Sequence, residues 1–366
     1  MKVLVVGPNR QSPGGVANYY DAVFPRLSDD AVTAHYLVIG SALEHGYGLH
    51  IITDQIRFWR TIGQLNPDII HLNPSLGIKS FLRDGMFVFL AKLRKKPVLV
   101  FFRGWQEPFE KTVSGQLMWF FKATYGRADG FIVLAKSFSE RLREWGITTP
   151  IYLGNTTVAN ELLEEFSIDR KIEDITNTKI VRLLYLARLE REKGVLELLK
   201  AVHIMLEKGI SVSLTIAGDG PIMGEVQQQV AKLGSQQEKI KIVGYVRGQT
   251  KIETLGTHHV YCLPTQYGEG MPNSVLEAMA FGMAVVTYPV GGIADFFDKN
   301  KMGVLLKSTN PEEIAKSIVS LIEYRERLID IARHNYNYAQ KYFLASSSAE
   351  MLRTCYGEIL SASRPL

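Results

Sequence analysis

Residues 264–282 read PTQYGEGMPNSVLEAMAFG, and they follow directly on the apolar run VYCL at 260–263. The proline and glycines end this run as a strand, and Asn273 or Ser274 then offers a side-chain cap for a short helix that closes at Gly282. A strand, a glycine loop and a helix in this order point several amides at one spot, where the helix dipole adds positive potential. The stretch therefore predicts a receptor for an anion such as phosphate.

Two glutamates flank this expected anion site, and each has two interpretations. Glu277 is placed to hold a ligand, but Ser274-x-x-Glu277 is also the capping-box pattern, in which the glutamate bonds back to the cap amide. Glu269 lies between glycines, where backbone approaches a ligand closely, although an exposed loop glutamate is the common alternative. Neither residue alone decides between binding and structure.

Composition places the chain among soluble globular proteins. With 366 residues, 46% hydrophobic and 22% charged, it is long enough for two domains with separate cores. The start, MKVLVVGPN, lacks the apolar region of a signal peptide, and no apolar run reaches the roughly 18 residues of a membrane span. Cys262 and Cys355 form no disulfide or metal-ligand pattern. We expect a cytoplasmic protein without a structural metal.

The positive charge lies in the first half of the chain. Residues 1–150 carry 18 Lys and Arg against 12 Asp and Glu, whereas residues 151–366 carry 24 against 25. The excess gathers at 79–96, where basic and apolar residues alternate in a helix-like stretch. One interpretation is an ordinary helix with a solvated basic end. Another is peripheral contact with an anionic membrane at its inner face, which attracts each Lys or Arg by about 1 kcal/mol. Nucleic acid is not expected, because no binding motif accompanies the charge.

Short β-branched runs alternate with helical patterns along both halves of the chain. In the first half, the expected strands are 3–6, 35–39, 69–72, 98–102 and 130–134, and the expected helices are 16–27, 52–63, 78–93, 114–126 and 137–145. In the second half, the expected strands are 181–187, 212–217, 240–243, 260–263, 284–287 and 303–305, and the expected helices are 193–207, 222–233, 248–255, 274–281 and 311–323.

This alternation predicts an α/β protein with two Rossmann-like, doubly wound domains. The polar segment 156–178 marks the crossing between them. We expect an N-terminal domain at 1–155 and a second domain at 156–344, with the last helix, 345–366, packing back on the first. Ligands of such sheets bind at the carboxyl ends of the strands.

Two common uses of this fold are excluded by their motifs. A dinucleotide loop needs G-x-G-x-x-G directly after a strand. Here Gly7 is followed by proline and a long loop to the Pro-Gly-Gly at 13–15, and the Gly-Asp-Gly-Pro at 218–221 has its next glycine one position late. No phosphate-binding P-loop motif occurs either.

Two further turns are candidates for binding an anion together with the 264–282 loop. Gly14 and Gly15 can direct amides at a ligand or form a simple helix entry. Arg188 follows an expected strand and Lys193 opens the next helix, so together they can clamp a phosphate, although the segment also fits a solvated turn. With no Asp-x-Asp pair to hold a divalent cation, these groups would neutralise a diphosphate without metal.

The ordered motifs of the second half resemble one enzyme family. The segments are ARLEREKG, AGDGP, VGYV, GEGMPNSVLEAMAFGMAVV, VGGIAD and GVLL, within residues 181–306. Their order strongly resembles the retaining glycosyltransferases of family 4, which have the GT-B fold. The first half resembles the family more loosely, through its PGG loop and PDIIH strand.

The resemblance implies a role for each matching residue. Arg188 and Lys193 would contact the donor diphosphate, Glu277 the ribose, and Glu269 the transferred sugar. Val243 and Gly244 would frame the nucleobase. The implied catalytic set is Glu269, Arg188, Lys193 and Arg103. The implied donor-binding set is Gly14, Gly15, Gly218, Val243, Gly244, Gly270, Met271, Pro272, Asn273, Ser274 and Glu277.

The chain departs from the family pattern after its fourth strand. The family has a His-Gly pair there, whose histidine reaches the donor sugar, but this chain has Arg103-Gly104. Arg103 would hydrogen-bond the sugar or bind an acidic one. His71 is the nearest alternative, and its competing interpretation is a satisfied histidine at a strand end. Asp295 replaces the glutamate that follows the family's GG turn.

The implied reaction is metal-independent transfer of a sugar, expected from a UDP donor, to a hydroxyl of a glycan or lipid-linked acceptor in envelope polysaccharide biosynthesis. No cofactor is expected beyond the donor substrate. The resemblance implies same-face attack, and a covalent route through Glu269 is the alternative. Two further alternatives are a sugar-nucleotide epimerase or phosphorylase, and a sugar-nucleotide-binding subunit with weak catalysis.

Overall fold

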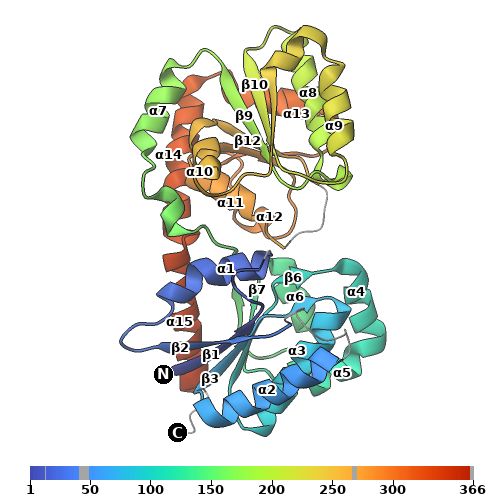
Figure 1. Cartoon of the computed structure of the whole chain (residues 1–366), viewed down its shortest axis with the longest axis vertical. Coiled ribbons are helices and arrows are strands. Elements are labelled where there is room, and N and C mark those ends of the chain that lie inside the picture. Colours follow the sequence, from blue (N-terminus) through green and yellow to red (C-terminus); the bar gives the residue numbers. More distant parts are fainter. Residues whose placement is uncertain (13, 41–48, 266–269, 363–366) are drawn as a thin grey trace. The chain divides into compact units, whose positions relative to one another are not determined.

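The computed structural model describes residues 1–12, 14–40, 49–265 and 270–362, and it divides into two compact units (Figure 1). The first unit comprises Met1–Thr157, Gly268–Met271 and Ala345–Leu366. The second unit comprises Val158–Tyr267 and Pro272–Leu344.

A six-stranded parallel sheet forms the centre of the first unit. Its order is β2-β1-β3-β5-β7-β8, so the direction of winding reverses between β1 and β3. The strands are apolar along most of their length because helices cover both faces. They are β1 (Lys2–Gly7), β2 (Thr33–Val38), β3 (Ile69–Leu72), β5 (Val98–Phe101), β7 (Gly130–Val133) and β8 (Ile151–Leu153).

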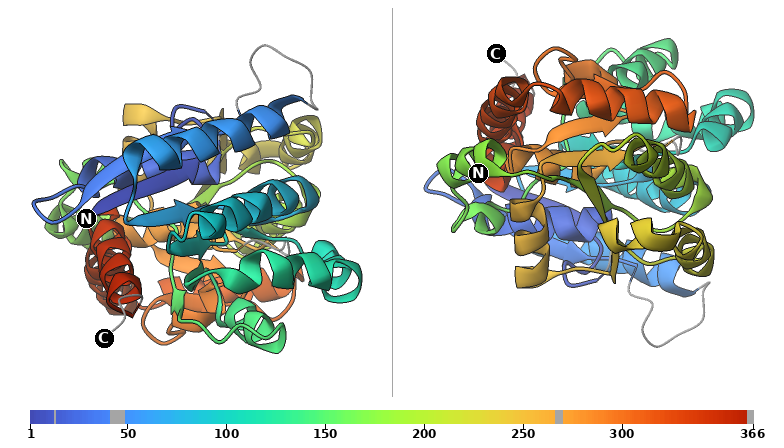
Figure 2. Two further views of the ribbon diagram at one scale, coloured as in Figure 1. Left: turned by 90° about the horizontal axis from the view of Figure 1, so that it is seen from below. Right: turned by 90° about the horizontal axis from the view of Figure 1, so that it is seen from above.

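Alternate residues of β1 show how the helices cover this sheet. Leu4 and Val6 join the core that includes Phe58 and Phe87 of α2 and α3, whereas Val3 and Val5 face α1 and α15 (Figures 1 and 2). A small pair, β4 (Ser75–Leu76) and β6 (Gly104–Trp105), follows the carboxyl ends of β3 and β5. The helices are α1 (Gly15–Val23), α2 (Leu49–Leu65), α3 (Ile78–Leu93), α4 (Glu107–Thr112), α5 (Met118–Ala123), α6 (Lys136–Glu144) and α15 (Ala345–Ala362).

The second unit has its own six-stranded parallel sheet, in the order β11-β10-β9-β12-β13-β14. Its winding reverses between β9 and β12. These strands are β9 (Val181–Leu186), β10 (Val212–Ala217), β11 (Ile240–Gly244), β12 (Val260–Leu263), β13 (Ala284–Thr287) and β14 (Gly303–Leu305).

The helices of the second unit also form two layers. Helices α8 and α13 pack together on one side of the sheet, and α14 packs against α7 and α11 on the other (Figure 1). The helices are α7 (Ile168–Asn177), α8 (Val195–Glu207), α9 (Met223–Ala231), α10 (Gly248–Thr257), α11 (Asn273–Ala280), α12 (Ile293–Phe296), α13 (Pro311–Ile322) and α14 (Arg325–Tyr342).

The predicted pair of doubly wound α/β sheets is confirmed, but one local prediction is wrong. Helix α11 begins at Asn273, its N-cap is Pro272, and no side chain caps it. The cap expected at Asn273 or Ser274 is therefore not formed. Proline fits this boundary because its fixed φ is compatible with the first turn and it has no amide to satisfy. The short strands β4, β6 and β8 were not predicted, since two or three residues carry no clear periodicity.

Candidate functional site

The loops after β9, β10 and β11 are hydrogen-bonded together at the carboxyl edge of the second sheet. The amide of Leu189 donates to the carbonyl of Asp219 at 2.9 Å, and that of Gly218 donates to the carbonyl of Gly244 at 2.7 Å. A Cβ at Gly218 would lie 1.9 Å from the carbonyl oxygen of Ala187, so only glycine allows this approach. The predicted residues Gly218 and Gly244 are thus brought beside the loop that carries Arg188.

The loop after β9 also meets the loop after β12. Gly194 has a left-handed φ of 75°, and a Cβ there would lie 2.3 Å from the carbonyl oxygen of Pro264. The hydroxyl of Thr265 donates to the carbonyl of Glu192 at 3.3 Å. These contacts hold the turn containing Lys193 against the start of the 264–282 stretch. Because the sheet reverses between β9 and β12, this is the crevice where α/β sheets bind ligands.

Lys193 and Arg188 differ sharply in their surroundings. Lys193 is only 8% exposed, and its burial lowers the pKa of the ammonium from its ordinary value, with Glu190 acting in the opposite direction. The Arg188 side chain is 75% exposed, and its Nη2 lies 3.0 Å from Oε1 of Glu190. Such an exposed pair contributes about 1 kcal/mol or less, so an anionic ligand can compete for Arg188.

Glu277 is held by a lysine that the sequence did not single out. The carboxylate is 8% exposed, and its Oε1 lies 2.7 Å from Nζ of Lys251 on α10. The Ser274 hydroxyl is instead 2.6 Å from the hydroxyl of Tyr261. The capping-box interpretation of Glu277 is therefore wrong. No motif marks Lys251, because only the fold brings α10 beside α11.

The remaining donor-site candidates of the second unit lie around these loops. Val243 is 40% exposed at the end of β11, and Gly244 has a φ of 68° with open space at its Cβ position. Met271 precedes the N-cap Pro272. Asp295 lies in the first turn of α12. Glu269 lies outside the described residues.

In the first unit, Gly14 is the N-cap of α1. It has a φ of 145° and no side-chain cap, and neither Gly14 nor Gly15 has an atom within 4 Å of its Cβ position. The space beside these two glycines is therefore open. Both interpretations of this turn, helix entry and amide donor, fit this geometry.

His71 is a satisfied core histidine. It is fully buried, with Nδ1 2.6 Å from the hydroxyl of Tyr356 and Nε2 3.3 Å from that of Tyr20, which donates to Asn73 at 2.8 Å. Burial lowers the pKa of His71 to about 3, and nearby Arg103 acts in the same direction. His71 therefore stays neutral, and its position gives it no access to a ligand.

Arg103 lies between β5 and β6, and its guanidinium contacts the rings of Tyr19 and Phe101. Its Cζ lies 3.8 Å from the ring centre of Tyr19 and 4.2 Å from that of Phe101. Nε and Nη1 are inaccessible and have no hydrogen-bond partner in the described part of the chain. Unlike Arg188 and Glu277, Arg103 has no protein counter-charge there.

Two family models match most of the chain. Residues 166–341 match the model "Glycosyl transferases group 1", and residues 2–152 match the model "Glycosyl transferase 4-like domain". The chain belongs to the group 1 glycosyltransferases. The family that its motifs resemble is thereby confirmed.

Known proteins of this kind match over different lengths. An uncharacterized glycosyltransferase of Methanocaldococcus jannaschii is 27% identical over 307 residues, which cover 77% of this chain and 76% of that protein. The capsular polysaccharide biosynthesis glycosyltransferase CapM of Staphylococcus aureus is 23% identical over 201 residues, covering 55% and 52%. The crystal structure of Anabaena HepE with UDP superposes with a TM-score of 0.73 at 15% identity, covering 98% of this chain and 100% of that one. Its likeness shows the shared GT-B fold.

Surface hollows of this glycosyltransferase lie away from the candidate site. One, of about 350 Å³, is bordered by Ile180 and Val212, and another, of about 480 Å³, by Arg170 and Arg182. Both are at the amino ends of strands in the second unit. Because ligands of parallel sheets bind at the carboxyl ends, we do not assign the donor to either hollow.

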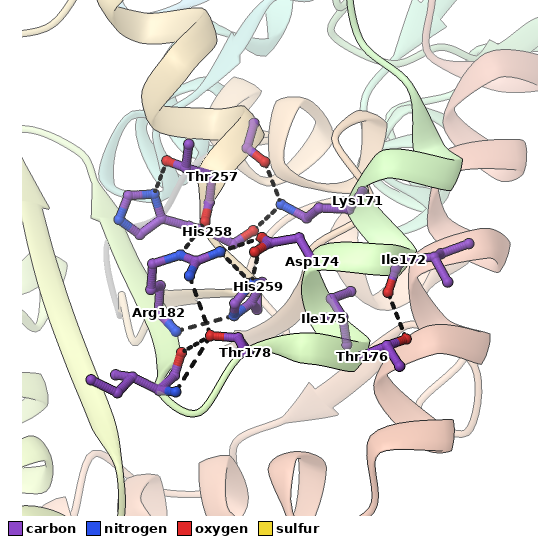
Figure 3. A network of polar contacts seen from close by, with 12 residues as sticks. Lys171, Ile172, Asp174, Ile175, Thr176, Thr178, Arg182, Thr257, His258 and His259 are labelled. Atoms are coloured by element: carbon purple, nitrogen blue, oxygen red, sulfur yellow. Dashed lines mark hydrogen bonds and ion pairs between the residues drawn. The ribbon is translucent and has the colours of Figure 1, made fainter.

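Buried and partly exposed polar side chains form a network beside the second hollow (Figure 3). Lys171 of α7 donates to the carbonyls of Gly256 and His258. Asp174 pairs with Arg182 of β9 and accepts from Nε2 of His259 at 3.0 Å. The network ties α7 to the amino ends of β9 and β12, so its role is structural.

The described residues hold neither a membrane-spanning helix nor a metal-binding group of side chains. None of the helices in this part of the chain has both the length and the apolar character needed to cross a membrane. No three His, Cys, Asp or Glu side chains there group closely enough to hold a metal ion. Metal-independent transfer stays a prediction.

Proposed function

We propose that this glycosyltransferase moves a sugar from a UDP donor to a hydroxyl of a glycan or lipid-linked acceptor, with retention at the anomeric carbon. The observation that carries the proposal is the meeting of the β9 and β12 loops, through Gly194 and Pro264, where the sheet of the second unit reverses. HepE was crystallised with UDP, and CapM belongs to capsular polysaccharide biosynthesis. The first supports a UDP donor, and the second supports a polysaccharide product.

In this proposal the site works by stabilising the departing diphosphate. Lys193 is already desolvated, and Arg188 can exchange Glu190 for a phosphate. The first-turn amides of α11 have no side-chain cap, so they can also donate to phosphate. Preorganised positive groups of this kind lower the barrier as charge develops on the leaving group.

Glu277 would accept hydrogen bonds from the ribose hydroxyls in this site. Lys251 occupies Oε1 and fixes the orientation of the carboxylate, and it leaves the remaining acceptor positions for a ligand. Same-face attack assisted by the leaving phosphate fits a site built from cations. A covalent route would instead require a carboxylate such as Glu269 at the anomeric carbon.

The diphosphate clamp is tested by calorimetry with UDP. Lys193→Ala should weaken UDP binding about tenfold or more, because it removes a desolvated cation beside the phosphates. The exposed Lys200 on α8 provides the control variant Lys200→Ala, which should bind UDP like the wild type. Equal UDP affinity for wild type and Lys193→Ala would sink the proposed site.

The type of turnover is tested with UDP-glucose and other UDP-sugars. Transfer requires an acceptor and gives a product with the donor's anomeric configuration, which proton NMR reports directly. Turnover without acceptor, or only with inorganic phosphate, would instead identify an epimerase or phosphorylase. Donor binding with no turnover would identify a binding subunit.

We further propose that the first unit docks on an anionic membrane through α3. Its residues Ile78, Leu82, Met86 and Leu93 are between 38% and 57% exposed. At 100° per residue they fall within an arc of about 80°, so they form one apolar stripe. Several basic residues expected to add to this surface are instead paired within the protein. Lys92, for example, lies 2.8 Å from Asp129.

The docking surface is tested by co-sedimentation with phosphatidylglycerol vesicles. Because the exposed stripe is apolar, Leu82→Ser with Leu93→Ser should reduce binding more than 0.5 M salt does. The control is Lys200→Ala in the second unit. Absence of wild-type binding at low salt would reject the docking surface.

A further inference from the structure

Arg103 lies at the carboxyl edge of the first sheet, where that sheet is built to meet a ligand. It follows β5, and its amide donates to the carbonyl of Pro74 at 2.8 Å, which anchors the backbone beside the loop after β3. The winding reverses between β1 and β3, so the loops after β1, β3 and β5 surround the switch point. The position of the side chain is therefore set by the fold.

The guanidinium is buried, and no acidic side chain among the described residues pairs with it. Burial lowers the pKa of Arg103 from its ordinary value, and the groups that oppose this shift are the hydroxyls of Tyr19, Tyr20 and Tyr36. These tyrosines are neutral, because burial raises the pKa of each. A buried charge without a counter-charge is strongly unfavourable in a protein interior. Such a charge persists where a ligand compensates it.

A second unpaired cation lies nearby. The Cζ of Arg10 is 4.7 Å from the ring centre of Phe24 and 5.6 Å from that of Tyr36. The charges of Arg10 and Arg103 both lower the pKa of Tyr36, in opposition to its burial. Over residues 1–12, 14–40, 49–265 and 270–362, neither arginine forms an ion pair. The carboxyl edge of this sheet thus holds two positive charges that the described protein leaves uncompensated.

Three of the neutral polar side chains near Arg103 are already engaged with each other, whereas the buried Tyr19 hydroxyl has no hydrogen-bond partner among the described residues. Tyr20 is hydrogen-bonded to both His71 and Asn73, and Asn73 also donates to the carbonyl of Val6 at 3.1 Å. These three side chains do not need the guanidinium to satisfy them. Nε and Nη1 of Arg103 are covered and unpaired, whereas Nη2 is not. Nη2 therefore provides the edge at which an oxyanion can bind.

We propose that Arg103, assisted by Arg10, binds a carboxylate or phosphate carried by a sugar substrate, so that the enzyme selects an acidic sugar. The inference rests on the proposed sugar transfer. The anionic group belongs either to the transferred sugar, as in a UDP-hexuronic acid, or to the acceptor. In both cases the same chemistry, an oxyanion on a sugar, supplies the counter-charge that Arg103 lacks among the described residues.

The test uses the full chain and matched ligand pairs in calorimetry. UDP-glucuronic acid against UDP-glucose tests the donor, and glucose 6-phosphate and glucuronic acid against glucose, with UDP present, test the acceptor. In at least one pair the wild type should prefer the acidic ligand about tenfold, as expected for charge-assisted pairing. Arg103→Gln should lose this preference and bind UDP within about twofold of the wild type.

The control is Arg127→Gln, which changes an exposed arginine that stacks on Phe89 at 5.7 Å and should keep the preference. Equal affinity within both pairs for the wild type, or a preference retained by Arg103→Gln, overturns the proposal while UDP binding still stands. Failure to bind UDP at all overturns the proposed function and this inference together.

Thermal unfolding separates ligand binding from a structural role. Without ligand, Arg103→Gln should melt at or above the wild-type temperature, because it removes an uncompensated buried charge. The preferred acidic ligand should raise the melting temperature of the wild type but not that of the variant. A loss of about 5 °C or more in the unliganded variant would show a structural arginine and overturn the proposal.

Discussion

The charges around α7 of the second unit are compensated by the fold, whereas Arg103 of the first unit has no acidic partner among the described residues. Around α7, Arg182 forms an ion pair with Asp174, and Asp174 is also hydrogen-bonded to His259. Lys171 donates hydrogen bonds to two backbone carbonyls (Figure 3). Arg103 of the first unit contacts the rings of Tyr19 and Phe101, which are nearly perpendicular to each other, and it has no carboxylate partner in the described part of the chain. Similar residue types thus occur in two different electrostatic settings.

The positions of the two groups explain the difference. The α7 network lies at the amino ends of β9 and β12, where strands begin and loops must be tied down. Arg103 follows the carboxyl end of β5, where parallel sheets bind substrates. A charged side chain that is paired within the protein contributes to its stability. A charged side chain without a protein partner at the carboxyl edge of a sheet is available for binding a ligand. The predictions below test this division.

The largest effect is expected from Asp174→Ala, which removes the counter-charge of the α7 network. Arg182 would lose its charged acceptor and Nε2 of the buried His259 its hydrogen-bond acceptor, so the free energy of unfolding should fall by about 2 kcal/mol. Urea unfolding measures the change. UDP affinity should stay the same, because the network lies at the opposite edge of the sheet from the candidate site.

The control for Asp174→Ala is Glu173→Ala on the same helix. Glu173 is exposed, so its loss should change the free energy of unfolding by less than about 0.5 kcal/mol. Equal stability of the two variants, or weakened UDP binding by Asp174→Ala, would contradict a purely structural network.

The next effect concerns Glu277, a compensated charge that nevertheless lies at the ligand edge. Glu277→Gln keeps the shape of the side chain but loses the charge that attracts ribose hydroxyls and Lys251. UDP affinity should fall about tenfold, or about 1.4 kcal/mol. Calorimetry and a melting curve on one preparation measure both properties. A large loss of melting temperature with unchanged UDP affinity would assign Glu277 to stability.

A smaller effect is expected in the pH dependence of stability. Burial lowers the pKa of Lys171 to about 7 from its ordinary 10.5. Below pH 7 both the folded and the unfolded chain carry this proton. Between pH 7 and 10.5 the unfolded chain binds more protons than the folded chain. The free energy of unfolding should therefore rise with pH above 7, by about 1 kcal/mol from pH 7.5 to 8.5.

Lys171→Met provides the comparison, since it removes this one titration. Urea unfolding at both pH values should show a rise in the wild type that the variant lacks. Parallel pH dependence in the two proteins would mean that Lys171 is protonated throughout this range.

The repeated α/β pattern and the glycine turns were predictable because they depend on local sequence. Hydrophobic periodicity located the long strands, and the motifs located the turns now found around Gly218 and Gly194. The partners of the charged residues were not predictable, because only tertiary packing brings α10 to α11 or Tyr19 to Arg103. Ser274 and Glu277 fit a capping pattern in the sequence. In the structure, however, Pro272 is the N-cap of the helix, and Glu277 pairs with Lys251.

The smallest effect is expected at the exposed pair of Arg188 and Glu190, which lies at the ligand edge but outside the protein interior. Glu190→Gln breaks the 3.0 Å contact between two solvated side chains, so the free energy of unfolding should change by less than about 0.5 kcal/mol. UDP affinity should stay equal or increase, because Arg188 no longer has to leave a carboxylate. Calorimetry at low and high salt measures this. A fall in UDP affinity would mean that Glu190 positions Arg188 for the diphosphate, and exposed charges at this edge would then be as organised as the buried ones.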